Sequence, residues 1–191
     1  MIEIVPTILV KNIAEFKNTV QKIENDFTFA QIDVMDGRFV KTTTFFDVDE
    51  INIIQTFLQY EVHLMVSDPT NYIKKVRNLK NAKKILFHYE TAHDIKSISS
   101  EIRNMGCLAG LVANPDTNIE DIKDQIYHVD LVMFMGVYPG ASGQKFIPST
   151  VEKVRFIREG NEHIPIEIDG GVSDETARAL VDAGATILAV G

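Results

Sequence analysis

The sequence predicts an α/β fold, a (β/α)8 barrel of the TIM-barrel type whose eighth helix is missing from the chain. Three observations predict it. Eight short apolar runs follow one another along the chain. Segments with apolar residues three or four positions apart, the helical period, separate these runs. The runs are apolar almost throughout and do not alternate with polar residues, which is typical of parallel strands covered by helices.

The expected strands and helices can be placed by these runs and by the residues between them. The strands are expected at residues 2–9, 29–34, 60–65, 84–88, 108–112, 131–135, 164–169 and 186–190. Asp68 before Pro69 and Ser173 before two acidic residues are typical of helix starts. Gly106, Gly160 and Gly184 are expected to end helices just before new strands.

The alternative is an open, doubly wound sheet, which normally carries a glycine-rich phosphate turn after its first strand. Residues 7–12 read Thr-Ile-Leu-Val-Lys-Asn and contain no glycine, so the closed barrel is favoured. We expect one domain over residues 1–191, apparently truncated after the eighth strand. The apolar flank of strands one and eight should then be uncovered, either because the chain stops early or because a partner subunit covers it.

Composition narrows the class of protein. Of 191 residues, 45% are hydrophobic and 24% are charged, which is typical of a well-packed globular domain. The net charge of −8 argues against a nucleic-acid or membrane-surface partner. Cys107 is the single cysteine, so an internal disulfide is excluded. The N-terminus lacks a basic leader, and no apolar run approaches the roughly 20 residues of a membrane span, so a cytoplasmic protein is expected.

Polar residues gather at the carboxyl ends of the expected strands, where barrel enzymes place their active sites. Gln31 and Asp33 share one face of their strand because side chains alternate. A single strand-end aspartate is more often a helix cap or loop ligand. Together, these groups predict a mostly apolar cavity with metal-binding or acid–base groups. The residues concerned are Thr7, Gln31, Asp33, Asp36, His63, His88, Asn114 and Asp169, with Met35, Met65 and Met135 between them. His88 either lines the mouth or is simply packed at the end of its strand.

Glycines near the carboxyl end predict a phosphate site. Gly170 and Gly171 lie between the seventh strand and the next helix, where backbone amides can converge on an anion. Gly191 opens the loop after strand eight, which completes the usual barrel phosphate site. A plain tight turn is the alternative. The loop over residues 137–146 has the small residues of an active-site lid, although a plain solvent loop would look the same.

Taken in order, several motifs resemble the ribulose-phosphate 3-epimerase family over essentially the whole chain. They are Asp33-Val34-Met35-Asp36-Gly37, His63-Leu64-Met65, Asn114-Pro115, Met135 with Val137 and Pro139-Gly140, Gly143-Gln144 with Phe146, and Asp169-Gly170-Gly171-Val172.

The resemblance implies an isomerase of the pentose phosphate pathway that inverts carbon 3 of a ketose phosphate, converting D-ribulose 5-phosphate to D-xylulose 5-phosphate. Asp33 and Asp169 would be the two catalytic bases on opposite faces of the substrate, working through an enediolate that a divalent ion (Zn, Mn, Fe or Co) stabilises. Asp33, His63 and Asp169 would hold that ion. The implied substrate-binding residues are Thr7, Met35, Met65, Met135, Gly140, Gly143 and Gln144, and the implied phosphate-binding residues are Gly170, Gly171 and Gly191. A homo-oligomer is also implied.

The sequence departs from the family pattern at one metal ligand. Gln31 stands where the family has its first metal histidine, and an amide oxygen is a poorer ligand for zinc-like ions than an imidazole nitrogen. We therefore expect weaker metal binding or an ion that prefers oxygen. Val10, Gly136 and Tyr138 also differ from the family pattern and leave the exact sugar open.

Three other functions remain alternatives. One is an epimerase for a related ketose phosphate such as D-allulose 6-phosphate, and another is a phosphosugar-binding barrel without catalysis or with an impaired metal site. A Schiff-base aldolase would need a lysine at the carboxyl end of a strand. Lys83 and Lys84 begin the fourth strand at the opposite end, which argues against an aldolase.

Overall fold

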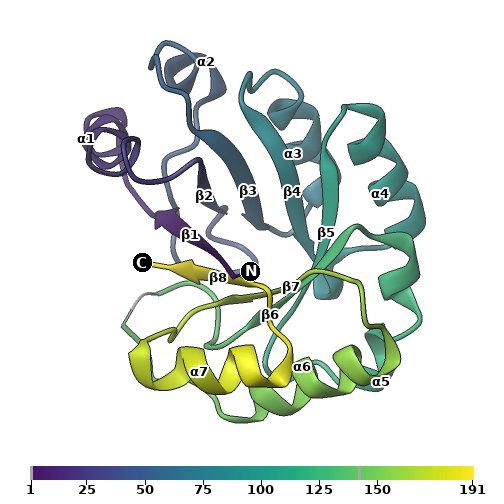
Figure 1. The fold of residues 1–191 in the computed structure, drawn as a ribbon. Helices are drawn as coiled ribbons and strands as arrows, with labels where there is room; N and C mark the ends of the chain where they lie inside the picture. The colour runs from purple at the N-terminus through teal and green to yellow at the C-terminus, as the bar shows by residue number, and fades with distance from the viewer. Residues whose placement is uncertain (1, 142) are drawn as a thin grey trace.

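The computed structural model describes residues 2–141 and 143–191. Its eight strands are all parallel and pair in chain order, and β8 pairs back with β1 to close the barrel (Figure 1). Helices surround the barrel in the same order. The predicted (β/α)8 barrel without an eighth helix is therefore confirmed.

The elements follow the predicted alternation. The strands are β1 (Glu3–Ile8), β2 (Phe29–Met35), β3 (Gln59–Met65), β4 (Ala82–His88), β5 (Leu108–Ala113), β6 (Leu131–Met135), β7 (Ile166–Asp169) and β8 (Ile187–Val190). The helices are α1 (Ile13–Ile23), α2 (Val48–Ile51), α3 (Pro69–Val76), α4 (Ile95–Asn104), α5 (Ile119–Ile122), α6 (Ser149–Gly160) and α7 (Asp174–Ala183), with 3-10 turns η1 (Tyr89–Thr91) and η2 (Gln125–His128).

Most helix boundaries have the local cause that the sequence predicts. The Asp68 side chain accepts a hydrogen bond from the Asn71 amide at the start of α3, and Pro69 takes the first helical position. Ser173 and Thr176 form a reciprocal capping box at the start of α7. Gly160 ends α6 as predicted, as the last residue of the helix, and Asn161 is the cap.

The inside of the barrel is polar at both ends and apolar between them. Buried apolar residues of β4, β5 and β6 form a cluster inside it, namely Leu86, Val112, Leu131, Met133 and Met135. Toward the amino-terminal end, Lys84 Nζ lies 3.1 Å from Glu61 Oε2. Burial alone would lower the pKa of Lys84, but the carboxylates of Glu61 and Glu167 raise it. A protonated, paired lysine at this end cannot serve as a Schiff-base nucleophile at the other.

Exposed apolar residues lie along β1, where an uncovered flank is expected, and fewer lie along β8. Ile2 and Ile4 are 36% and 43% exposed beside β1. On β8, Leu188 is buried in the main hydrophobic cluster, and Val190 is partly buried against it. Among the residues that the structure describes, no helix has the length and apolarity needed to cross a membrane.

Candidate active site

A cavity of about 660 Å³ opens at the carboxyl ends of the strands. Both predicted catalytic aspartates and every predicted substrate- or phosphate-binding residue line it. These residues are Asp33, Asp169, Thr7, Met35, Met65, Met135, Gly140, Gly143, Gln144, Gly170, Gly171 and Gly191. These predicted residues come from five strands (β1, β2, β3, β6 and β7) and from the segments after β6, β7 and β8, and the fold brings them to one place.

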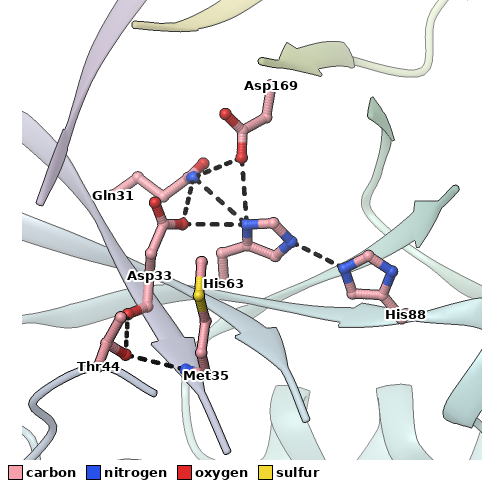
Figure 2. Close-up of polar contacts among 7 residues, drawn as sticks. All are labelled: Gln31, Asp33, Met35, Thr44, His63, His88 and Asp169. Carbon is pink, nitrogen blue, oxygen red and sulfur yellow. Dashed lines mark hydrogen bonds and ion pairs between the residues drawn. The ribbon is translucent and has the colours of Figure 1, made fainter. Parts of the chain in front are cut away.

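Three ionisable side chains meet here: Asp33 and Asp169, which line the cavity, and the fully buried His63, which contacts both of them. Asp33 and His63 are register partners on the neighbouring strands β2 and β3, and Asp169 ends β7 across the barrel. His63 Nδ1 lies 3.1 Å from Asp33 Oδ1 and 3.2 Å from Asp169 Oδ2 (Figure 2). One ligand atom from each residue lies within 4.8 Å of the others, and all three residues are buried. This group could bind a divalent metal ion.

Gln31 joins the group through its side-chain amide. Its Nε2 donates to Asp33 Oδ1 and to Asp169 Oδ2, each at 2.9 Å (Figure 2). Its Oε1 is buried and has no hydrogen-bond partner. Rotating the amide by half a turn exchanges its oxygen and nitrogen, which turns this orphaned oxygen toward the carboxylates. Two carboxylates, one imidazole nitrogen and one amide oxygen are a donor set that fits a divalent ion with some preference for oxygen.

The close packing of these groups shifts their pKa values. Burial and the neighbouring Asp169 raise the pKa of Asp33 against the opposing effect of its hydrogen bond with His63. Burial alone would lower the pKa of His63, but hydrogen bonds with Asp169 and Asp33 raise it to about 9. Without a metal ion, His63 is therefore an imidazolium at neutral pH, and its positive charge holds the two carboxyl groups together.

Backbone contacts fix the end of β2. The Thr44 hydroxyl donates to the Asp33 carbonyl at 2.7 Å and accepts from the Met35 amide at 2.9 Å (Figure 2). Asp36 plays the ordinary part of a strand-end aspartate, because it accepts from backbone amides of its own loop and from Ser67. Burial works against these hydrogen bonds, yet they lower the pKa of Asp36 to about 2.

The predicted phosphate region has the backbone shape that glycine permits. Gly170 and Gly171 have φ angles of 93° and 68°. A side chain at Gly171 would lie 2.8 Å from the Cα atom of Phe146, so only glycine lets the two loops meet here. The helix α7 begins just beyond, with Ser173 as its cap. The turn therefore leaves its backbone open to the cavity.

The expected lid over residues 137–146 lies along the same cavity, and its Ser142 falls outside the described residues. The Gln144 amide donates to the carbonyls of Tyr138 and Ala141, at 2.6 and 2.9 Å. The Thr42 hydroxyl donates to the Gly140 carbonyl at 2.6 Å. These contacts hold part of the loop against the mouth of the barrel.

Sequence reasoning missed two residues behind the site. His88 at the end of β4 was interpreted as a mouth residue or a packed histidine, and Glu90 was not considered. His63 Nε2 lies 2.9 Å from His88 Nε2 (Figure 2), and His88 Nδ1 lies 3.2 Å from Glu90 Oε2. The local signal was a histidine and a glutamate two residues apart where a barrel strand ends.

Fold and site together define a class of protein, a (β/α)8 barrel with ionisable side chains gathered at its carboxyl-terminal mouth, where barrel enzymes have their active sites. Comparison with known proteins narrows the class. The model of the ribulose-phosphate 3 epimerase family matches residues 3–191, so the chain belongs to this family and is an isomerase of the carbohydrate epimerase type.

Individual relatives agree. Ribulose-phosphate 3-epimerase of Chlamydia muridarum is 38% identical to this chain over 97% of it and 84% of the relative. The Bacillus subtilis enzyme of that name is 34% identical over 100% of this chain and 91% of the relative.

Two solved structures share the fold at lower identity. N-acetylmannosamine-6-phosphate 2-epimerase from Clostridium perfringens has a TM-score of 0.69 at 15% identity. The match covers 98% of this chain and 85% of the epimerase chain. A tryptophan synthase alpha-subunit from Pyrococcus furiosus has a TM-score of 0.74 at 16% identity. The match covers 99% of this chain and 86% of the subunit.

Proposed function

We propose that this protein inverts the configuration at carbon 3 of D-ribulose 5-phosphate to give D-xylulose 5-phosphate. The observation that carries the proposal is the convergence of Asp33 and Asp169 on one cavity, from strands on different sides of the barrel. The names of the relatives support this substrate.

Inversion beside a ketone needs two bases, because one base reaches only one face of the reacting carbon. In this proposal one aspartate removes the carbon-3 proton, and the other donates a proton to the opposite face. The electron pair of the broken C–H bond passes into the neighbouring carbonyl, giving an enediolate, and returns to carbon 3 when the new C–H bond forms. One aspartate must therefore be ionised while the other is protonated. The raised pKa of Asp33 makes this side chain easier to protonate than an ordinary aspartate.

A divalent ion, when bound, supplies the positive charge that stabilises the enediolate oxygens. Asp33, His63 and Asp169 would hold it, and the orphaned Oε1 of Gln31 is available as a fourth donor. Because that donor is an amide oxygen, we propose an ion more tolerant of oxygen ligands, such as Mn²⁺ or Fe²⁺, ahead of Zn²⁺.

The remaining cavity residues suit the rest of a ketose phosphate. Met35, Met65 and Met135 are nearly fully buried and give apolar walls that keep water from the reacting carbon. The amides around Gly170 and Gly171, with Gly191 beside them, would bind the phosphate group. Thr7, Gly140, Gly143 and Gln144 would contact the sugar chain. We further propose a cytoplasmic homo-oligomer.

The decisive experiment is deuterium wash-in at carbon 3. Purified protein is stripped of metal, reloaded separately with Mn²⁺, Fe²⁺, Co²⁺ or Zn²⁺, and incubated with D-ribulose 5-phosphate in D2O. We expect deuterium at carbon 3 in both epimers, with Mn²⁺ or Fe²⁺ most effective. An absence of exchange with all four ions would overturn the epimerase proposal. D-allulose 6-phosphate, tested in parallel, decides between the two sugars.

A second candidate, a phosphosugar-binding barrel without catalysis, is favoured by one observation. The Gln31 amide already satisfies both carboxylates without any metal ion. If this candidate were right, the protein would bind D-ribulose 5-phosphate in calorimetry and show no exchange at carbon 3.

A further inference from the structure

We propose that His88 and Glu90 are positioning residues, which hold His63 in the single tautomer whose Nδ1 can bind a metal ion. This inference rests on the proposed function, because it assigns a role to the residues behind the metal site. Neither residue lines the cavity described above, so neither would contact the substrate.

The three side chains form a continuous chain of hydrogen bonds that leads away from the site. The Nε2 atoms of His63 and His88 lie 2.9 Å apart, and His88 Nδ1 lies 3.2 Å from Glu90 Oε2. Both histidine side chains are fully buried. Water therefore does not compete for these ring nitrogens, and each has to be satisfied by its neighbour in the chain.

The protonation at the far end is set by Glu90. Its Oε1 accepts hydrogen bonds from the Asn114 amide, at 2.9 Å, and from the Thr117 hydroxyl. Burial alone would raise the pKa of Glu90, but hydrogen bonds from His88, Thr117 and the Asn114 amide lower it to about 2. An ionised carboxylate only accepts hydrogen bonds. His88 must therefore carry its proton on Nδ1.

The protonation at the near end is set by the metal site. A ring nitrogen that binds a metal ion carries no proton, so a His63 ligand with Nδ1 toward the site has its proton on Nε2. That proton needs an acceptor, and the unprotonated Nε2 of His88 is 2.9 Å away. Glu90 at one end of the hydrogen-bonded chain and the metal site at the other thus require the same placement of protons on the two histidine rings. In the other tautomer of His63, two lone pairs would face each other at this distance.

Packing holds the chain in place. The Phe39 ring lies against the His88 ring, with centroids 4.7 Å apart. Lys153 Nζ donates to the carbonyls of Pro115 and Thr117, each at 2.6 Å, in the loop that supplies the donors to Glu90. Both ring orientation and loop position are therefore fixed before any ion binds.

Three variants separate this role from simple packing. Glu90→Gln keeps the size of the side chain, but its amide nitrogen would face His88 Nδ1 and demand the opposite tautomer along the whole chain. His88→Phe keeps a ring and removes the acceptor. His88→Gln restores both an acceptor for His63 and a donor for Glu90. His93→Phe, at an exposed position, is the matched control.

Binding of Mn²⁺ alone, measured by electron paramagnetic resonance of the free ion, is the first readout. We expect affinity to fall about 10–100-fold in Glu90→Gln and His88→Phe, as is usual when partners of metal ligands are lost. His88→Gln should recover most of the loss, and His93→Phe should match wild type. The second readout is 15N NMR of the Zn²⁺-loaded protein, in which wild-type His63 should carry its proton on Nε2.

The outcomes distinguish the two proposals. If wild type binds Mn²⁺ and both Glu90→Gln and His88→Phe bind it equally well, the positioning role is overturned and the epimerase proposal stands. A wild-type His63 with its proton on Nδ1 in the Zn²⁺ form also overturns it. If wild type binds no ion, the metal-dependent epimerase and the positioning role fail together. Should His88→Phe not fold, the isosteric Glu90→Gln and the rescue variant His88→Gln decide the question.

Discussion

Gln31 Nε2 and Asp169 Oδ2 lie 2.9 Å apart, although 138 residues separate them in the sequence. The same nitrogen donates to Asp33, so a neutral amide bridges two carboxyl groups that would otherwise repel. Together with the His63 imidazolium, this contact keeps Asp33 and Asp169 close together without a metal ion.

Replacing Gln31 tests this bridge. Gln31→His adds an imidazole nitrogen to the donor set, and we expect Zn²⁺ affinity to rise by about tenfold or more, because zinc prefers nitrogen to amide oxygen. Gln31→Leu removes the donor to both carboxylates, and should cost on the order of 1–3 kcal/mol of metal-free stability. Competition with a chromophoric chelator and urea unfolding measure the two effects. Unchanged zinc affinity in Gln31→His would mean that this side chain does not face the ion.

The two aspartates should differ in the epimer from which each removes the carbon-3 proton. Asp33→Asn and Asp169→Asn should each lower the rate of epimerisation by at least about 10²–10⁴-fold, the usual contribution of a general base. Each variant should still exchange the carbon-3 proton of one epimer, namely the epimer whose proton faces the remaining aspartate. Proton NMR in D2O, starting from each pentulose phosphate, measures this asymmetry. Exchange of both epimers by either variant would contradict the two-base arrangement.

Metal-free stability should depend on pH through His63. Its pKa is about 9 in the folded protein and 6.5 in the unfolded chain. Between these values the folded state keeps a proton that the unfolded state has lost. The stabilisation is therefore complete below pH 6.5 and disappears as pH rises through 9, with a size on the order of 3 kcal/mol. Urea unfolding of metal-free protein at pH 6 and pH 9.5 tests this. In His63→Gln, the free energy of unfolding should differ less between the two pH values than in wild type. If it differs as much as in wild type, the pH dependence comes from other groups.

Gly136 should tolerate no side chain. A Cβ atom there would lie 2.1 Å from the Gly170 carbonyl oxygen and 2.9 Å from the Phe146 ring. We expect Gly136→Ala to cost about 1–3 kcal/mol and to raise KM by displacing the turn at Gly170 and Gly171, which lines the cavity. Gly160→Ala is the matched control, because a Cβ atom at the end of α6 meets nothing within 4 Å. That substitution should be neutral or stabilise by about 0.5–1 kcal/mol in thermal unfolding. If the two substitutions changed stability equally, the loop after β6 would be able to move aside for the added methyl group.

The sequence by itself determined the barrel and the faces of its strands. Apolar runs alternating with helical periods require parallel strands under helices, and two-residue alternation alone places Gln31 and Asp33 on the same inward face. The glycines at positions 170 and 171 marked a turn that backbone conformation permits only to glycine. These are local properties, so neighbouring residues are enough to fix them.

Only the tertiary structure decided what meets across the barrel. Closure of β1 on β8 brings Asp169 opposite Asp33, and no local spacing sets that distance. The direction of the Gln31 amide, and the nitrogen through which His63 faces His88, depend on neighbours from other strands. Strand periodicity tells which side chains point inward. Hydrogen-bond partners and shared charge depend on ångström-scale positions that appear only once all eight strands have closed.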